Sequence, residues 1–115
     1  MQAYQIIVST CPDITTAEQL AGHLVDTQLA ACVNIIPGVR SIYVWKGERQ
    51  SDNEVIVLIK APGSAYPAIE TLIRDLHPYE LPEIIAIDIN GGLPEYLTWL
   101  HDQTAGSRSE ASKQD

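Results

Sequence analysis

Two cysteines and one histidine are the side chains in this sequence best suited to binding a transition-metal ion, because thiolate sulfur and imidazole nitrogen are good copper ligands. Cys11 follows the first apolar segment, at a turn where the N-terminus of the next helix could lower its thiol pKa. Cys32 begins a long strand-like segment, and His77 lies in the motif LHPYELPE. A free cysteine is often a small buried apolar residue, and His77 could instead cap a helix. The sequence therefore names His77, Cys11 and Cys32 as candidate ligands and leaves both roles open.

A second group of side chains combines aromatic rings, one lysine and several carboxylates. A few polar groups within an aromatic wall are typical of small-molecule or anion sites, so these residues could converge on one cleft. The alternative is structural: the rings pack as anchors, and Lys60 and Glu83 form an ion pair. The predicted cleft residues are Tyr43, Trp45, Lys60, Tyr79, Glu80 and Glu83.

Sequence motifs of enzymes do not accompany these residues. The chain contains no glycine-rich phosphate loop, no H-E-x-x-H, no G-x-S-x-G and no C-x-x-C. Nucleophilic, hydride-transfer and zinc-hydrolase chemistry therefore lack their minimal sequence elements. The expected activity is binding and not catalysis.

Composition limits the class of protein further. With 115 residues, we expect one domain over residues 1–104 and a disordered polar tail over residues 105–115. The net charge of −8, with seven Lys and Arg that form no cluster, disfavours binding to nucleic acid or to an anionic membrane. No run reaches transmembrane length and no signal peptide is recognisable, so we expect a cytoplasmic protein with reduced cysteines.

A long β-hairpin is the main element expected to position the candidate residues. Apolar and polar residues alternate from Val33 to Lys46, and a strand of this length spans roughly 45 Å. The last expected strand, Ile84 to Asn90, is only about half as long, so the hairpin must protrude. Free strand edges pair readily with other chains. Self-assembly through the hairpin is therefore predicted.

Two segments of the hairpin need separate interpretation. Pro37 and Gly38 interrupt its first strand, and they indicate either a kink in one bent strand or a true turn between two strands. We favour one bent strand. The polar residues 47–53 are expected to close the hairpin before the apolar strand from Glu54 to Lys60, whose composition suits burial on both faces.

The other elements give the order β-α-β-β-α-β with an added C-terminal helix, an α+β arrangement of the ferredoxin-like type. Two helices would cover one face of a four-stranded sheet and leave an apolar face for a second copy. The expected elements besides the hairpin are a strand at 4–9, a helix from a Thr15–Glu18 capping box to Gln28, a helix capped by Ser64 and ended by His77, with Ile69, Leu72, Ile73 and Leu76 inward, a strand at 84–90 and a helix at 94–101.

Four motifs resemble those of the CutA family of divalent-cation tolerance proteins. They are LAACVN leading into IPG (29–38), SIYVWKG (41–47), HPYELPE (77–83) and YLTWL (96–100). The resemblance spans residues 4 to about 101. It implies a homotrimer of ferredoxin-like domains, similar in architecture to the PII signalling proteins, whose long hairpins pair between subunits. The expected trimer interface contains Tyr43, Val44, Trp45 and Trp99.

The resemblance also implies a role in tolerance of divalent metal ions, with Cu²⁺ or another divalent cation as the possible ligand. Some CutA proteins build a copper site from a cysteine near the end of the first strand and two adjacent histidines before Pro-Tyr. Here Ser9 lies near the cysteine position, Cys11 follows two residues later past the expected strand end, and Leu76 precedes His77. A PII-like module that binds a small ligand or anion between subunits, and a purely structural trimer, remain the alternatives.

Overall fold

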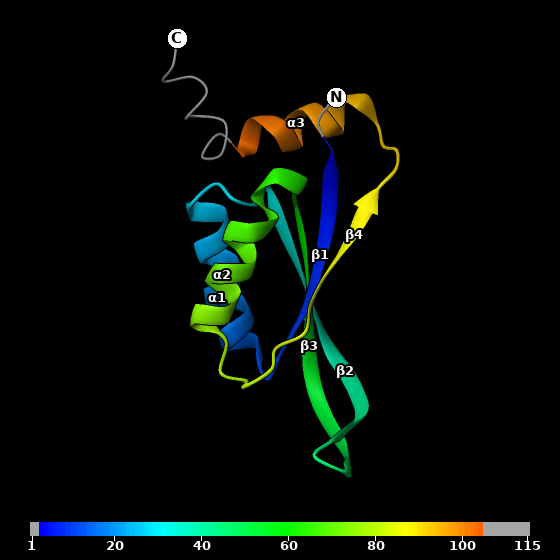
Figure 1. Cartoon of the computed structure of the whole chain (residues 1–115). Helices are drawn as coiled ribbons and strands as arrows, with labels where there is room; N and C mark the ends of the chain where they lie inside the picture. Colours follow the sequence, from blue (N-terminus) through cyan, green and yellow to red (C-terminus); the bar gives the residue numbers. More distant parts are fainter. Residues whose placement is uncertain (1–2, 105–115) are drawn as a thin grey trace.

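The computed structural model describes residues 3–104, and the expected polar tail at 105–115 lies outside them (Figure 1). The order of elements is the predicted one, with an α-helix added after the last strand. The elements are β1 (Tyr4–Cys11), α1 (Ile14–Asp26), β2 (Cys32–Trp45), β3 (Glu48–Pro62), a 3₁₀ turn (Gly63–Ala65), α2 (Tyr66–Leu76), β4 (Ile84–Ile89) and α3 (Pro94–Gln103).

The four strands form one antiparallel sheet in the order β2-β3-β1-β4, and α1 and α2 cover one of its faces (Figure 1). Strand residues on the covered face, such as Ile7, Val57 and Ile59, are fully buried with Leu24 of α1 and Ile69 of α2. Burial of this apolar face is the main stabilisation of the domain. The predicted α+β fold is confirmed.

The opposite face of the sheet retains exposed apolar side chains. Ile6 and Val8 alternate along β1 with the buried Ile7, and in the β1-β4 register they pair with Ile87 and Ile85. Both β4 isoleucines are exposed, as the model of two helices on one face predicted. An exposed apolar face of this kind is typical of a contact surface.

The hairpin of β2 and β3 extends beyond the helical layer and gives the molecule its elongated shape, 54 × 28 × 23 Å (Figure 1). Its register shifts between Ile36 and Val39, at Pro37 and Gly38, and Gly38 has a φ of 80°. Glycine adopts positive φ without the steric strain of a Cβ, so a bulge forms here. The prediction of one bent strand is confirmed, and the alternative of two strands is wrong.

The hairpin closes earlier than predicted. Lys46 and Gly47 form the turn, with φ values of 51° and 82°, and β3 begins at Glu48. Positive φ at both central residues is the geometry of a two-residue hairpin turn that follows the twist of the strands. The expected closing loop at 47–53 is therefore wrong. These polar residues are part of β3, and a strand tolerates them here because both faces of the ribbon are accessible to solvent.

The first helix begins with a different cap from the one predicted. β1 continues to Cys11, which pairs with Val55, and the Asp13 carboxylate accepts a hydrogen bond from the Thr16 N–H at 2.8 Å. This side chain caps α1 and not Thr15. An aspartate caps a helix N-terminus with its full charge, so it competes well with a nearby threonine.

The other helices deviate from expectation at their ends. Ser64 lies in the 3₁₀ turn and does not cap α2, which begins at Tyr66 with Pro67 in its first turn. Leu76, expected to point inward, is exposed at the last position of α2. α3 is two residues longer than predicted, and its Leu100 is fully buried. None of the helices between residues 3 and 104 is long and apolar enough to cross a membrane.

Candidate functional site

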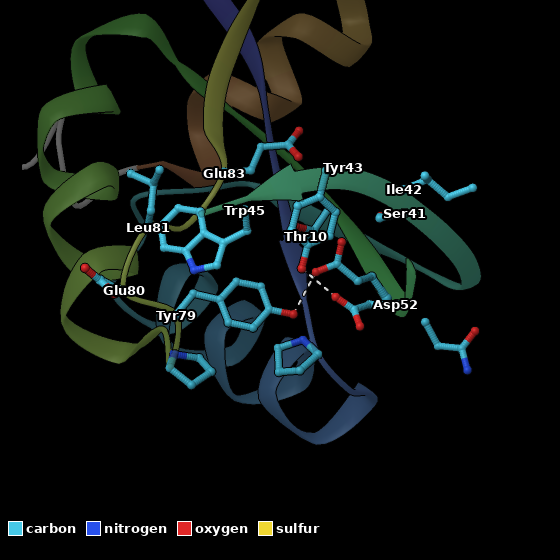
Figure 2. A pocket seen from close by; sticks show the side chains of 14 residues that line it. Thr10, Ser41, Ile42, Tyr43, Trp45, Asp52, Tyr79, Glu80, Leu81 and Glu83 are labelled. Carbon is cyan, nitrogen blue, oxygen red and sulfur yellow. Dashed lines mark hydrogen bonds between the residues drawn. The ribbon is translucent and has the colours of Figure 1, made fainter. Parts of the chain in front are cut away.

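A pocket of about 960 Å³ lies at the base of the protruding hairpin. Its walls come from the hairpin strands, from the end of β1 and from the loop that joins α2 to β4 (Figure 2). Five of the six predicted cleft residues line it. The lining residues used below are Tyr43, Trp45, Asp52, Glu54, Tyr79, Glu80 and Glu83.

A partly buried hydrogen bond joins the loop to the hairpin across this pocket. The Tyr79 hydroxyl donates to Glu54 Oε2 at 2.7 Å. Glu54 is only 6% exposed. Burial, and then the bond to the Glu54 carboxylate, raises the pKa of the Tyr79 phenol strongly. Tyr79 is therefore a neutral hydrogen-bond donor to the Glu54 carboxylate.

A second tyrosine–carboxylate pair lies further along the hairpin. The Tyr43 hydroxyl donates to Asp52 Oδ2, and this bond raises the pKa of Tyr43. In the β2-β3 register Asp52 pairs with Ser41, so Tyr43 reaches it diagonally from the next position on the same face. The two pairs place carboxylates and aromatic rings side by side along one wall.

His77 fixes the loop that carries Tyr79. Its backbone N–H donates to the Ile73 carbonyl at 2.8 Å and ends α2, as the capping alternative predicted. Its ring Nδ1 accepts from the Tyr79 N–H at 3.1 Å, so Nε2 carries the proton and donates to the Thr10 carbonyl at 2.6 Å. With 8% exposure and both ring nitrogens bonded, His77 ties the loop to β1.

The other two predicted metal ligands lie apart. Cys11 is fully buried, and burial, followed by the charges of Asp13 and Glu54, raises its thiol pKa to about 11. This direction is opposite to the one expected from a nearby helix N-terminus. Cys32 is half-buried and pairs with Lys60, whereas Cys11 pairs with Val55, roughly 17 Å away along β3. Within residues 3–104, no three His, Cys, Asp or Glu side chains gather as a metal site.

Lys60 is the predicted cleft residue that does not line the pocket. It lies near the far end of β3, opposite Ile6 and Cys32, and its Nζ is 5.7 Å from the centre of the Tyr96 ring. The expected Lys60–Glu83 ion pair is replaced by a different contact at the pocket rim. There, Lys46 Nζ lies 3.9 Å from Glu80 Oε1, with both side chains well exposed. Strand register explains why Lys60 does not reach the pocket. It lies roughly 20 Å along β3 from Glu54, which lines the pocket.

Asp52 and Glu54 are pocket residues that the sequence reasoning missed. Asp52 lay in the expected closing loop, and Glu54 was assigned only as the start of a buried strand. All residues from 48 to 54 are polar, so no apolar alternation marks this segment as a strand, although a strand period of two places Asp52 and Glu54 on one face of β3. A strand interpretation of 48–54 would have found both.

Comparison with known proteins identifies the family. The sequence profile described as "CutA1 divalent ion tolerance protein" matches residues 5–103. The chain belongs to the CutA1 family. CutA from mouse is 45% identical over 95 residues, which cover 83% of this chain but only 54% of the mouse protein. The divalent-cation tolerance protein CutA of Thermus thermophilus is 43% identical over 100 residues, covering 87% of this chain and 97% of that protein.

Solved CutA structures share the fold. The crystal structure of CutA from Xylella fastidiosa matches with a TM-score of 0.86 and 44% identity, covering 88% of this chain and 97% of that one. The chain spans about half the length of the mouse relative. CutA1 is described as a tolerance protein and not by an enzyme name. One rice relative is named chloroplastic and one CutA structure from Archaeoglobus fulgidus periplasmic, so the location differs within the family.

The residues expected at a trimer interface lie on the surface of this chain. Val44 is 67% exposed near the hairpin tip, and Tyr43 and Trp99 are also exposed. Trp45 is half-buried and contributes to the pocket. Trp99 stacks near Tyr96 on α3, with ring centres 5.5 Å apart. Their role in assembly stays a prediction.

Proposed function

We propose that this chain acts in tolerance of divalent metal ions, copper among them, as a cytoplasmic homotrimer that binds its ligand and does not catalyse a reaction. The observation that carries the proposal is the family match over residues 5–103. Relatives with over 40% identity bear the name divalent-cation tolerance protein. Binding suits a chain whose pocket holds tyrosine hydroxyls that donate hydrogen bonds to carboxylate oxygens.

Exposed apolar surface supports assembly of the trimer. Ile42 and Val44 are each about two-thirds exposed on the protruding ribbon. Ile85 and Ile87 are exposed on the sheet face opposite the helices. Isolated two-stranded ribbons are marginally stable in water, and exposed apolar side chains on a sheet face are typical of a contact surface. Pairing of hairpins between copies would cover these side chains.

The predicted metal ligands differ in how readily they could bind an ion. His77 would have to break its bonds to Thr10 or Tyr79, and Cys11 would have to leave a fully buried position and lose a tightly held proton. Cys32 is more accessible, because it is half-buried at the beginning of β2 and its thiol makes only a long contact of 4.0 Å with Asn34 Oδ1. Thiolate sulfur is a preferred ligand of copper ions, so Cys32 is the proposed first contact.

Complementation tests the proposed function. A bacterial strain whose own CutA-family gene is deleted would be grown in rising Cu²⁺ with this chain, with the Cys32→Ser variant, or with an empty vector. We expect the chain to restore copper tolerance and the variant to restore it less well at equal expression. Equal sensitivity with the chain and with the empty vector would contradict the proposal.

A second candidate function is a PII-like module that binds a small ligand where subunits meet. The pocket itself favours it, since a volume of about 960 Å³ is in the range of small-molecule sites. A ligand that protects Trp45 and Tyr79 from chemical modification, when copper does not, would support this candidate over metal binding.

A further inference from the structure

The charged side chains that line the pocket indicate whether its ligand is a cation or an anion. Among residues 3–104, its lining contains four carboxylates, those of Asp52, Glu54, Glu80 and Glu83, and no lysine, arginine or histidine. Lys60, the cation that would have suited an anion, lies elsewhere on β3. Carboxylates in a partly enclosed site attract cations and repel anions. The pocket is therefore unsuited to a phosphate or carboxylate ligand.

Aromatic rings distinguish an organic cation from a bare metal ion. Tyr43, Trp45 and Tyr79 lie between the carboxylates in the pocket wall (Figure 2). Two of the carboxylates already accept a tyrosine hydroxyl, which leaves further lone pairs for N–H donors but weakens them as ligands of a dry ion. Ring faces attract alkylammonium groups and pack against their methylenes.

The chain's own lysine shows how an ammonium group fits this wall. Lys46 Nζ lies 5.7 Å from the centre of the Trp45 ring and 3.9 Å from Glu80 Oε1. Both charged side chains are more than 70% exposed, so this contact is weak and open to exchange. Deeper in the pocket, the Glu54 carboxylate accepts the hydrogen bond of the Tyr79 hydroxyl and keeps other lone pairs for an N–H donor. The lysine thus marks the outer of two positions for an ammonium group.

We propose that the pocket binds a linear polyamine, with one ammonium group at Glu54 and Tyr79 and another at the rim near Glu80, Glu83 and Trp45. The aliphatic chain between the two charges would lie along the aromatic rings. The proposal deepens the second candidate function by naming its ligand class. It can fail while copper binding holds, because Cys32 begins β2 opposite Lys60, roughly 20 Å along the hairpin from the position of Glu54.

Titration with spermidine tests the proposal on the full chain at about 0.15 M salt, where long-range attraction to an acidic protein is screened. Trp45 reports binding directly when the other tryptophan is replaced, so the titration uses the Trp99→Phe background. We expect a saturable change in Trp45 fluorescence and one spermidine per chain by calorimetry. ATP, an anion of similar size, should give neither signal.

Charge-matched variants separate the pocket from general acidity. Glu83→Gln at the exposed rim and Glu54→Gln at the buried position should each weaken spermidine binding about five- to tenfold, the loss expected for one charge contact. Glu18→Gln, on the exposed surface of α1, removes the same charge elsewhere and should leave affinity unchanged. Circular dichroism checks that Glu54→Gln folds, and Glu83→Gln carries the test if it does not.

Three results would overturn the proposal. These are absence of saturable binding, equal weakening by Glu18→Gln and Glu83→Gln, and tighter binding of ATP than of spermidine. A parallel Cu²⁺ titration keeps the two proposals distinct, since loss of spermidine binding alone rejects only the polyamine site.

Discussion

His77 is the residue for which the sequence pattern and the structure differ most in function. The motif around it left a metal ligand and a helix cap as open alternatives, whereas the ring joins the Tyr79 N–H to the Thr10 carbonyl and holds one wall of the pocket. A buried polar group that loses its partner costs about 1–3 kcal/mol. His77 is therefore first a determinant of loop position.

Replacing His77 tests this role. His77→Ala leaves the buried Thr10 carbonyl and the Tyr79 N–H without their partner, so we expect the free energy of unfolding to fall by about 1–3 kcal/mol. Urea denaturation measures the change. His23→Ala, at an exposed position of α1, should stay within about 0.5 kcal/mol of the original chain. Equal stability of the His77 variant would contradict the structural role.

The buried thiol of Cys11 makes stability fall at high pH. Its folded pKa of about 11 lies above the usual thiol value of 9.0, so the unfolded chain loses this proton first as the pH rises. Titration of Cys11 should therefore give the free energy of unfolding no pH dependence below pH 9. The free energy of unfolding should fall by about 1–3 kcal/mol as the pH rises from 9 to 11. Denaturation of Cys11→Ala across this range isolates the effect from the tyrosines. Parallel pH curves for the two proteins would contradict it.

At the scale of elements, the sequence predicted whether a segment is a helix or a strand better than it predicted the first and last residues of that segment. Apolar periodicity identified each helix and strand because side-chain burial has a period of 3.6 or 2 residues. Ends depend on single local contacts, such as the Asp13 carboxylate at the Thr16 N–H, for which several residues compete. The ribbon residues 48–53 carried little apolar signal because both faces are exposed, and so their strand was missed together with Asp52.

The bulge in β2 can be tested by a glycine pair. Gly38 has a φ of 80° with open space around it, so Gly38→Ala should destabilise the fold by about 1–2 kcal/mol through backbone strain alone. Gly22 lies in α1, also with open space, and Gly22→Ala should stabilise it by about 0.5–1 kcal/mol. Thermal unfolding compares the two. A shift of the same sign in both variants would argue against a strained bulge at Gly38.

At the scale of the whole molecule, the protruding hairpin and the open sheet face both indicate an assembly. Hairpin length and the exposed β4 isoleucines could be inferred from the sequence, because strand rise and alternation fix them. The charge of the ligand that suits the pocket could not be inferred from the sequence, because it depends on strand register. Lys60 lies on the same face of β3 as the pocket residues but too far along the strand to line the pocket. Local patterns carry no information on such distances.

Trp45→Ala tests how the hairpin assembles. We expect light scattering of the original chain to give about three times the chain mass of 12.6 kDa, and the variant to shift toward one chain at micromolar concentration. A large aromatic side chain is lost from the surface that the hairpins are proposed to share. Trp45→Phe, which keeps an aromatic ring, should retain the assembly. An unchanged trimer for Trp45→Ala would contradict the role assigned to the hairpin.

Calorimetric titration of the metal-free chain with Cu²⁺ tests the proposed function most directly. We expect saturable binding of Cu²⁺, with an affinity that falls at least tenfold in Cys32→Ser. The change should be smaller in Cys11→Ser because that thiol is buried and protonated. Parallel titrations with Zn²⁺ and Ni²⁺ compare the affinity of the chain for copper with its affinity for other divalent ions. Binding that is weak, unsaturable and indifferent to both substitutions would contradict a metal-binding role for this chain.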